Sequence, residues 1–267
     1  MIGFHFQGNS NDWPDAVAKL PPGAPVKVID GVQRCPEAKS VNPDVYTVVR
    51  HHVDEQNPGG DQHQIARDFF ASFVDGSFRQ IAWAVDAVQE WNEYFSNSQG
   101  QAERDTWINM ARAFVDVWRD DYRTQADYAH IELILAETAV GNDIPMELAA
   151  LSHQYDWVVL GYHPYVPVYR GEMRPDHWRW YSGRWSFMDD NYIAGGYRVR
   201  WFFGEFGAVG HNGPGWPNSL APNDGWKDDD VYNGSLPDYV DMMRAWMTEA
   251  TKTRAWKEGR ILSLIHI

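Results

Sequence analysis

The sequence predicts an α/β protein that folds as a (β/α)8 TIM barrel, a ring of eight parallel strands covered by helices. Three observations lead to this fold class. Short apolar runs alternate with longer segments of helical periodicity, the order that parallel strands joined by crossover helices produce. Seven such runs follow one another along the chain, and an eighth lies near its end. The length of 267 residues suits one barrel domain.

The first half of the chain holds four expected strands. Each is a short run rich in apolar and β-branched residues, and we place them at residues 2–6, 26–29, 45–49 and 87–91. A short helix begins at Trp13, with Pro14 near its first turn. A longer helical segment runs from Asp61 to about Val85, and a break in it would fall at Gly76.

The second half of the chain continues the same alternation. Its clearest helix shows one broad apolar stripe, formed by Trp107, Met110, Ala111, Phe114, Val117 and Trp118. Further helices are expected from Pro145 to about Gln154, within the aromatic stretch 176–197, and around Met242 and Trp246. The strands of this half are expected at residues 130–135, 157–162, 199–203 and 260–262.

The ring closes only with the eighth strand, and a last helix usually covers that strand. The chain ends at Ile267, shortly after it. We therefore expect one barrel domain over residues 1–267 with an incomplete C-terminus, truncated at or near the eighth strand. The alternative fold is an open, doubly wound sheet. The lack of a Gly-rich nucleotide-binding motif between a strand and a helix counts against it.

The composition narrows the choice of partners. A net charge of -14 and a pI near 5.0 disfavour nucleic acid, because an acidic surface repels a phosphate backbone. The 14 Trp residues mildly favour carbohydrate, since flat rings stack on the apolar faces of sugars. No apolar run approaches the roughly 18 residues that span a bilayer, so no membrane partner is expected. No secretory signal is visible, although this start also fits a chain that begins inside a longer, extracellular protein.

Two glutamates follow expected strands, at the end where barrel enzymes hold their sites. Glu93 follows the fourth strand, in Trp91-Asn92-Glu93, and Glu205 follows the seventh, in Gly204-Glu205. Both side chains should therefore point into one mouth of the barrel. Two carboxyl groups on either side of a glycosidic bond can cleave it, one as proton donor and the other as nucleophile or base. The pair therefore predicts a glycosidase.

These segments resemble the clan A glycoside hydrolases, most closely the cellulase-like family 5. That clan carries an Asn-Glu pair after the fourth strand and a nucleophilic Glu after the seventh; Asn92-Glu93 matches the first and Phe203–Gly207 the second. The resemblance implies that Glu93 is the acid/base, that Asn92 hydrogen-bonds the sugar 2-hydroxyl, and that Glu205 is the nucleophile. The Pro that usually follows Asn-Glu is Tyr94 here, which leaves the subfamily open.

Further residues match less specific features of the same family. His163-Pro164-Tyr165 resembles its His-x-Tyr motif, whose aromatic hydroxyl hydrogen-bonds the nucleophile, and Tyr162 competes for that role. His51 or His52 resembles a histidine that lines the catalytic subsite. An arginine that holds the nucleophile ionised would be Arg50, with Arg34 as the second choice. The substrate-binding candidates are therefore Asn92, His51, His52, His163, Tyr165, Tyr162, Arg50 and Trp91.

The sequence thus predicts a monomeric, retaining glycoside hydrolase that acts on an oligo- or polysaccharide without a metal or other cofactor. The long segments 166–198 and 207–234 would shape its subsites, but nothing in them names the sugar. One alternative is a non-catalytic carbohydrate-binding barrel, either a pseudoenzyme or an inactive fragment, because the family's sugar-stacking Trp on strand eight has no counterpart here. Another alternative is a metal-dependent barrel hydrolase whose ligands would be His5, His51, His52 and His163.

Overall fold

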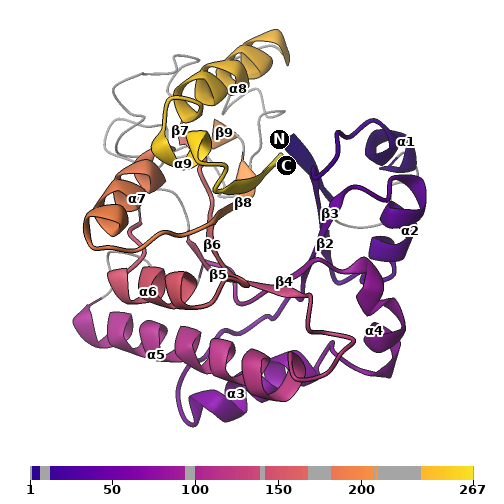
Figure 1. Ribbon diagram of the computed structural model, residues 1–267, viewed down its shortest axis with the longest axis vertical. Helices are drawn as coiled ribbons and strands as arrows, with labels where there is room; N and C mark the ends of the chain where they lie inside the picture. The colour runs from indigo at the N-terminus through magenta and orange to yellow at the C-terminus, as the bar shows by residue number, and fades with distance from the viewer. Residues whose placement is uncertain are drawn as a thin grey trace.

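The computed structural model describes residues 2–6, 13–93, 100–138, 142–167, 182–206, 208–209 and 236–266. Tyr94 and the greater part of the two long segments expected to shape the subsites lie outside these residues, as do the side chains of residues 4–6. Within the described part of the chain, the helices surround a ring of strands (Figure 1).

Eight parallel strands form the ring. They are β1 (Ile2–Phe6), β2 (Pro25–Ile29), β3 (Tyr46–Arg50), β4 (Ala87–Gln89), β5 (Glu132–Thr138), β6 (Val158–Tyr162), β8 (Trp201–Phe206) and β10 (Ile261–His266). Their order around the closed barrel is β1-β10-β8-β6-β5-β4-β3-β2. A separate parallel pair, β7 (Val166–Pro167) and β9 (Ala208–Val209), lies outside it. The predicted (β/α)8 fold class is therefore confirmed.

Most helices lie where the sequence predicts them, whereas the helices at Arg34–Val41 and Arg254–Lys257 were not expected. They are α1 (Trp13–Ala18), α2 (Arg34–Val41), α3 (Gln62–Ala71), α4 (Gly76–Ile81), α5 (Gln101–Val117), α6 (Met146–Gln154), α7 (Arg184–Ala194), α8 (Leu236–Ala250) and α9 (Arg254–Lys257). The expected break near Gly76 separates α3 from α4. Asp75 caps α4 by accepting hydrogen bonds from two backbone N–H groups of its first turn, so the chain restarts a helix there.

The eighth strand is longer than expected and closes the ring. The sequence predicted residues 260–262, whereas β10 extends to His266 and pairs with β8 on one side and β1 on the other. The register places Ile2 opposite Leu264, and the two ends of the chain lie next to each other in Figure 1. The expected C-terminal incompleteness therefore concerns only what would follow β10, and it stays a prediction.

The hydrophobic core has two parts because strand side chains alternate between the two sides of the ring. A small inner cluster fills part of the barrel and consists of Val48, Ala87, Ile134, Val159 and Phe202. The larger outer cluster packs the strands against the helices, and the stripe of α5 expected from the sequence belongs to it. Phe69 and Phe70 of α3 pack edge-on against Phe114 of α5. Burying each such ring contributes about 1.5–3 kcal/mol.

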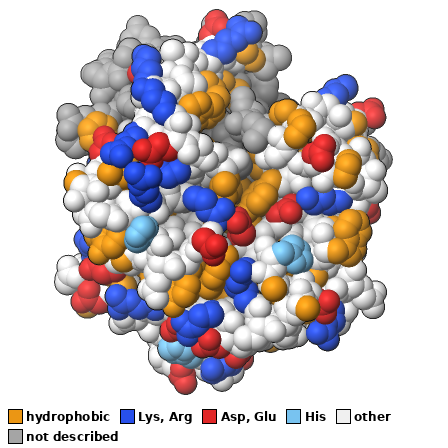
Figure 2. Space-filling model, in the orientation of Figure 1, with side chains coloured by type: hydrophobic (Ala, Val, Ile, Leu, Met, Phe, Trp, Pro, Cys, Tyr) orange, Lys and Arg blue, Asp and Glu red, His pale blue; other side chains and the backbone are white. Residues whose placement is uncertain are grey.

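The described surface mixes charges of both signs. Figure 2 shows Lys and Arg side chains interspersed with Asp and Glu over the visible face rather than gathered into one basic patch. Among the described helices, none is both long and apolar enough to cross a bilayer.

Candidate active site

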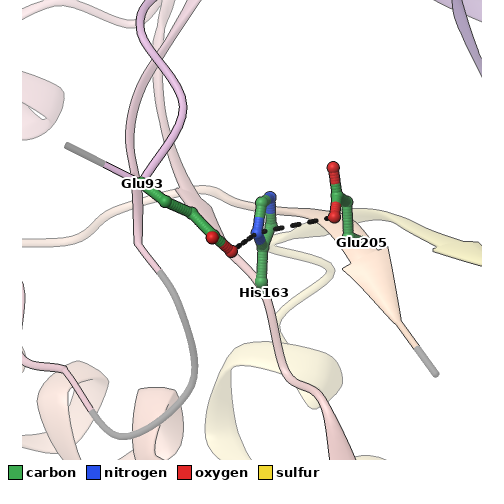
Figure 3. A group of neighbouring side chains, drawn as sticks. All are labelled: Glu93, His163 and Glu205. Carbon is green, nitrogen blue, oxygen red and sulfur yellow. Dashed lines mark hydrogen bonds and ion pairs between the residues drawn. The ribbon is translucent and has the colours of Figure 1, made fainter. Parts of the chain in front are cut away.

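The carboxyl ends of three strands bring two glutamates and a histidine together. Glu93 follows β4, His163 follows β6 and Glu205 lies in β8. Figure 3 shows the imidazole of His163 between the two carboxyl groups. Its Nδ1 hydrogen-bonds Oε1 of Glu93 and lies 3.9 Å from Oε2 of Glu205. The two glutamates singled out in the sequence therefore face the same point at the mouth of the barrel.

Glu205 is held on both of its oxygens. Arg50, the last residue of β3, places Nη1 3.1 Å from Oε1, and the hydroxyl of Tyr165 donates to Oε2. Burial raises the pKa of Glu205, but the positive charges of His163 and Lys27 outweigh burial and lower it overall. The carboxyl group is therefore ionised near neutral pH.

Tyr165 remains a hydrogen-bond donor at all ordinary pH values. Burial raises the pKa of its hydroxyl well above the usual value, and the negative charges of Glu205 and Glu93 raise it further. Of the two tyrosines considered for this role, Tyr165 is the one that reaches the carboxyl group. Tyr162, the last residue of β6, is fully buried in the outer cluster between strands and helices.

Glu137 is a third carboxylate at this site. It lies in β5, is 1% exposed, and its Oε2 is 2.9 Å from Nζ of Lys27 and 3.0 Å from Nε2 of His163. Burial alone would raise the pKa of Glu137, but Lys27 and His163 bring it down to about 2. A buried carboxylate with two cationic neighbours stays charged, and it fixes those neighbours in turn.

Two glycines make room for Glu137. A Cβ atom at Gly204 would lie 1.4 Å from Oε1 of Glu137, and one at Gly161 would lie 2.3 Å from its Cγ. Neither position tolerates a side chain while Glu137 keeps its place. The glycine before Glu205, which forms part of the motif noticed in the sequence, therefore makes room for a side chain of β5, two strands away around the barrel.

The backbone is strained at two positions beside the site, one after β4 and one in β5. Glu93 has a φ of 52° and Ala136 a φ of 61°, both in the left-handed region that side chains disfavour. Hydrogen bonding between the two strand ends holds this geometry, because Glu93 N–H donates to the carbonyl of Glu137 at 2.8 Å. A buried carboxyl group, Glu90, accepts the N–H of Ala136. Strain of about 1–3 kcal/mol per residue persists only where surroundings enforce it, often at functional sites.

His163 carries a positive charge here. Burial lowers its pKa, but the carboxylates of Glu205, Glu137 and Glu93 raise it to about 10. With a proton on each ring nitrogen, His163 can donate to Glu93 on one side and face Glu137 on the other. It then has no lone pair to offer a metal ion.

The carboxamide of Asn92 lies between the charged groups below the mouth. Oriented with its nitrogen toward Glu137, it donates to Oε2 of Glu137 and accepts from Nη2 of Arg50, both at 3.3 Å. Arg50 thus contacts both Asn92 and Glu205. The other arginine considered, Arg34, instead pairs with Glu37 at the exposed start of α2.

The remaining substrate-binding candidates have other neighbours. His51 stacks on Phe73 with ring centroids 5.3 Å apart and places Nδ1 3.2 Å from Asp30. His52 is about half exposed and lies beside Asp54. The buried ring of Trp91 packs edge-on against Phe114 of α5.

The described residues do not gather the histidines that a metal-dependent hydrolase would need. The ligand atoms of Glu93, His163 and Glu205 lie within 4.8 Å of one another, which is close enough for an ion. These three donors already have protein partners, because His163 contacts Glu93 and Glu137, and Glu205 contacts Arg50 and Tyr165. His51 and His52 lie apart from it, and the side chain of His5 is outside the described residues.

Sequence reasoning missed Lys27 and Glu137. Lys27 is the only charged residue in an apolar strand, Val26–Ile29, and its neighbours Val26 and Val28 face the helices. By alternation Lys27 faces the inside of the ring, where a cation requires a partner. The sequence alone therefore indicates that Lys27 has a buried acidic partner. Glu137 lies two residues beyond the strand expected at 130–135, and only the fold reveals that it is the partner.

No protein-family model matches the chain, and no curated protein gives a significant match. Solved structures do match. A broad-specificity GH5-4 endoglucanase from Clostridium cellulovorans aligns with 99% of this chain and 83% of its own, at a TM-score of 0.55 and 12% identity. The structure of XacCel5A aligns with 99% of this chain and 87% of its own, at a TM-score of 0.57 and 12% identity.

A third match is the Prevotella bryantii endo-beta-mannanase/endo-beta-glucanase PbGH26A-GH5A, with a TM-score of 0.50 and 13% identity. It aligns with 100% of this chain, which spans only 44% of that protein's length. At these identities the matches concern the fold. Over its full length, the chain has the barrel fold of clan A glycoside hydrolases, as the motifs in its sequence suggested.

Proposed function

We propose that this chain is a retaining glycoside hydrolase that cleaves O-glycosidic bonds of an oligo- or polysaccharide by double displacement. One observation carries the proposal: a carboxyl oxygen of Glu93 lies within 4.8 Å of a carboxyl oxygen of Glu205. Retaining enzymes hold their two carboxyl groups about 5–5.5 Å apart, whereas inverting enzymes leave about 6.5–9.5 Å for a water molecule. The short separation supports retention.

In the first step, the ionised Glu205 attacks the anomeric carbon as the bond from that carbon to the leaving oxygen breaks. Glu93 gives its proton to that oxygen, so the leaving group departs as an alcohol. In the second step, Glu93 takes a proton from water, whose oxygen attacks the anomeric carbon and releases the Glu205 carboxylate. Arg50 and Tyr165 keep Glu205 ionised and aimed, one at each oxygen.

Asn92 supports the same reading from its position. It precedes the acid/base, and its amide is fixed by Glu137 and Arg50. An amide held in this way next to both glutamates suits recognition of a sugar hydroxyl. The other candidates, His51, His52, Tyr162 and Trp91, have neighbours other than the two glutamates.

The proposal is tested with a panel of aryl glycosides and two variants. Glu205→Gln should remove nearly all turnover, and Glu93→Ala should be partly rescued by azide or by a good leaving group. Glu147→Gln, which changes a half-exposed glutamate at the start of α6, is the matched control and should keep full activity. Proton NMR of the first product should show the anomeric configuration of the substrate.

Three results would contradict the proposal. They are wild-type rates in Glu205→Gln, an inverted first product, and the absence of turnover on every substrate in the panel. Sugar binding without turnover would instead support the non-catalytic carbohydrate-binding barrel. The expected monomeric state is a separate matter that sedimentation equilibrium decides.

A further inference from the structure

We propose that Glu137 is a positioning residue: through its contact with Nε2 of His163, it holds the imidazole between the Glu93 and Glu205 carboxyl groups. This inference rests on the proposed glycosidase function. Its starting point is geometric: Glu137 contacts Lys27 and His163 inside the barrel and has no exposed side-chain surface. It does not itself face the point where the glycosidic bond would lie.

The fold is built around Glu137. Two other strands carry glycine where any side chain would collide with it, Gly161 in β6 and Gly204 in β8. Its backbone receives the N–H of Glu93, and the preceding residue, Ala136, is held in the left-handed region. A carboxylate that only neutralised Lys27 would not require glycines in β6 and β8 and a backbone hydrogen bond from the segment after β4.

Charge balance explains what Glu137 contributes. Five charged groups meet in the described part of the site: the carboxylates Glu137 and Glu205, and the cations Lys27, Arg50 and His163. Without the charge of Glu137, the buried cations Lys27 and His163 would have only Glu205 as a charged partner, which Arg50 also contacts. The group with the lower ordinary pKa would give up its proton first, and that group is His163 rather than Lys27.

A neutral His163 would affect both catalytic carboxyl groups, through the ionisation of Glu205 and the hydrogen bond to Glu93. Glu205 would lose the positive charge of His163, which lowers the pKa of Glu205 more than the charge of Lys27 does. Glu93 would lose a charge-assisted hydrogen bond, which is about twice as strong as a neutral one. The carboxyl groups of Glu205, Glu137 and Glu93 raise the pKa of His163. Lys27, Arg50 and Tyr165 are the other charged or titratable groups that face these carboxyl groups.

The first test needs no activity. Nitrogen-15 NMR of the histidine side chains, with His163 identified by its loss in His163→Gln, reports the protonation of each ring nitrogen. In the wild-type protein, His163 should keep both protons from pH 6 to pH 9. In Glu137→Gln it should lose one with a midpoint near its ordinary value of about 6.5. A wild-type His163 that titrates near that ordinary value would overturn the proposal, even if Glu137→Gln fails to fold.

The second test uses the pH dependence of kcat/KM. Glu137→Gln should lower kcat by about 10–100-fold, as small misplacements of catalytic groups do, and should move the acidic limb of the profile to higher pH. Glu132→Gln is the matched control, since Glu132 lies on the same strand at the opposite end, paired with Arg200. It should leave both the limb and the His163 signals unchanged. An acidic limb that stays in place in Glu137→Gln would refute the positioning role, whereas a wild-type enzyme without glycosidase activity would refute the proposed function alone.

Discussion

Replacing Lys27 by methionine should destabilise the protein far more than the removal of a charge from the surface would. Lys27 and Glu137 are both fully buried, and their charged atoms are 2.9 Å apart. Removing Lys27 leaves the buried Glu137 with His163 as its remaining cationic neighbour, and breaking a buried pair in this way costs about 3–5 kcal/mol. Methionine keeps a similar length and apolar stem, so the cost arises from the charge rather than from a cavity.

That free energy converts to a measurable melting temperature. Unfolding entropy is about 2.1 cal/mol/K per residue near 60 °C, so 267 residues give about 0.56 kcal/mol/K. A loss of about 3–5 kcal/mol therefore lowers Tm by about 5–9 °C. Urea unfolding followed by circular dichroism gives the free energy, and calorimetry gives Tm.

The control is Lys252→Met. Lys252 follows α8 and pairs with Glu249 of that helix, with both side chains about half exposed, and such pairs contribute about 0–1 kcal/mol. The double variant Lys27→Met/Glu137→Gln should lose about 0.5–3 kcal/mol less unfolding free energy than the two single variants lose in sum, because the second change removes the buried charge that the first leaves behind. The reasoning is refuted if Lys27→Met costs no more than Lys252→Met, or if the two costs add.

Three further outcomes are expected. Tyr165→Phe removes a hydrogen bond to the Glu205 carboxylate that is worth about 1.5–3 kcal/mol, so the acidic limb of kcat/KM should move up by about one to two pH units; an unmoved limb would argue against the contact. Gly204→Ala should destabilise the protein by several kcal/mol, since its Cβ would lie 1.4 Å from Glu137, and urea titration showing wild-type stability would contradict the tight packing. Burial raises the pKa of Glu137, but its cationic neighbours bring it to about 2, below its unfolded value of 4.5. Its contribution to stability is therefore present above pH 4.5 and lost as the pH falls through 2, and in Glu137→Gln the unfolding free energy should fall less steeply over this window.

The fold and the two central glutamates could be predicted because both follow from local pattern and strand direction. Parallel strands bring their carboxyl ends to one side, so Glu93 and Glu205 had to share a mouth once the alternation was recognised. Arg50 ends β3 and reaches Glu205, as the resemblance suggested. His51 is the next residue, and alternation turns it to the other side, where it stacks on Phe73.

The part that could not be predicted depends on pairs far apart in sequence. Lys27 and Glu137 are separated by 110 positions, and no local pattern links them. Glu137 also follows Ala136, whose left-handed backbone breaks the regular alternation of β5. Period-two reasoning gives the wrong face after such a residue, so only coordinates can show where the side chain points.

The pairing of β1 with β10 has a consequence for synthesis on the ribosome. β1 emerges before every other strand of the ring, yet its second neighbour consists of residues 261–266. Until those residues leave the exit tunnel, β1 and β8 each present an open edge of unpaired backbone groups, the kind of edge that invites aggregation. A nascent chain of this protein should therefore depend on chaperones until its last strand is released, and ring closure should be the late, slow step of folding.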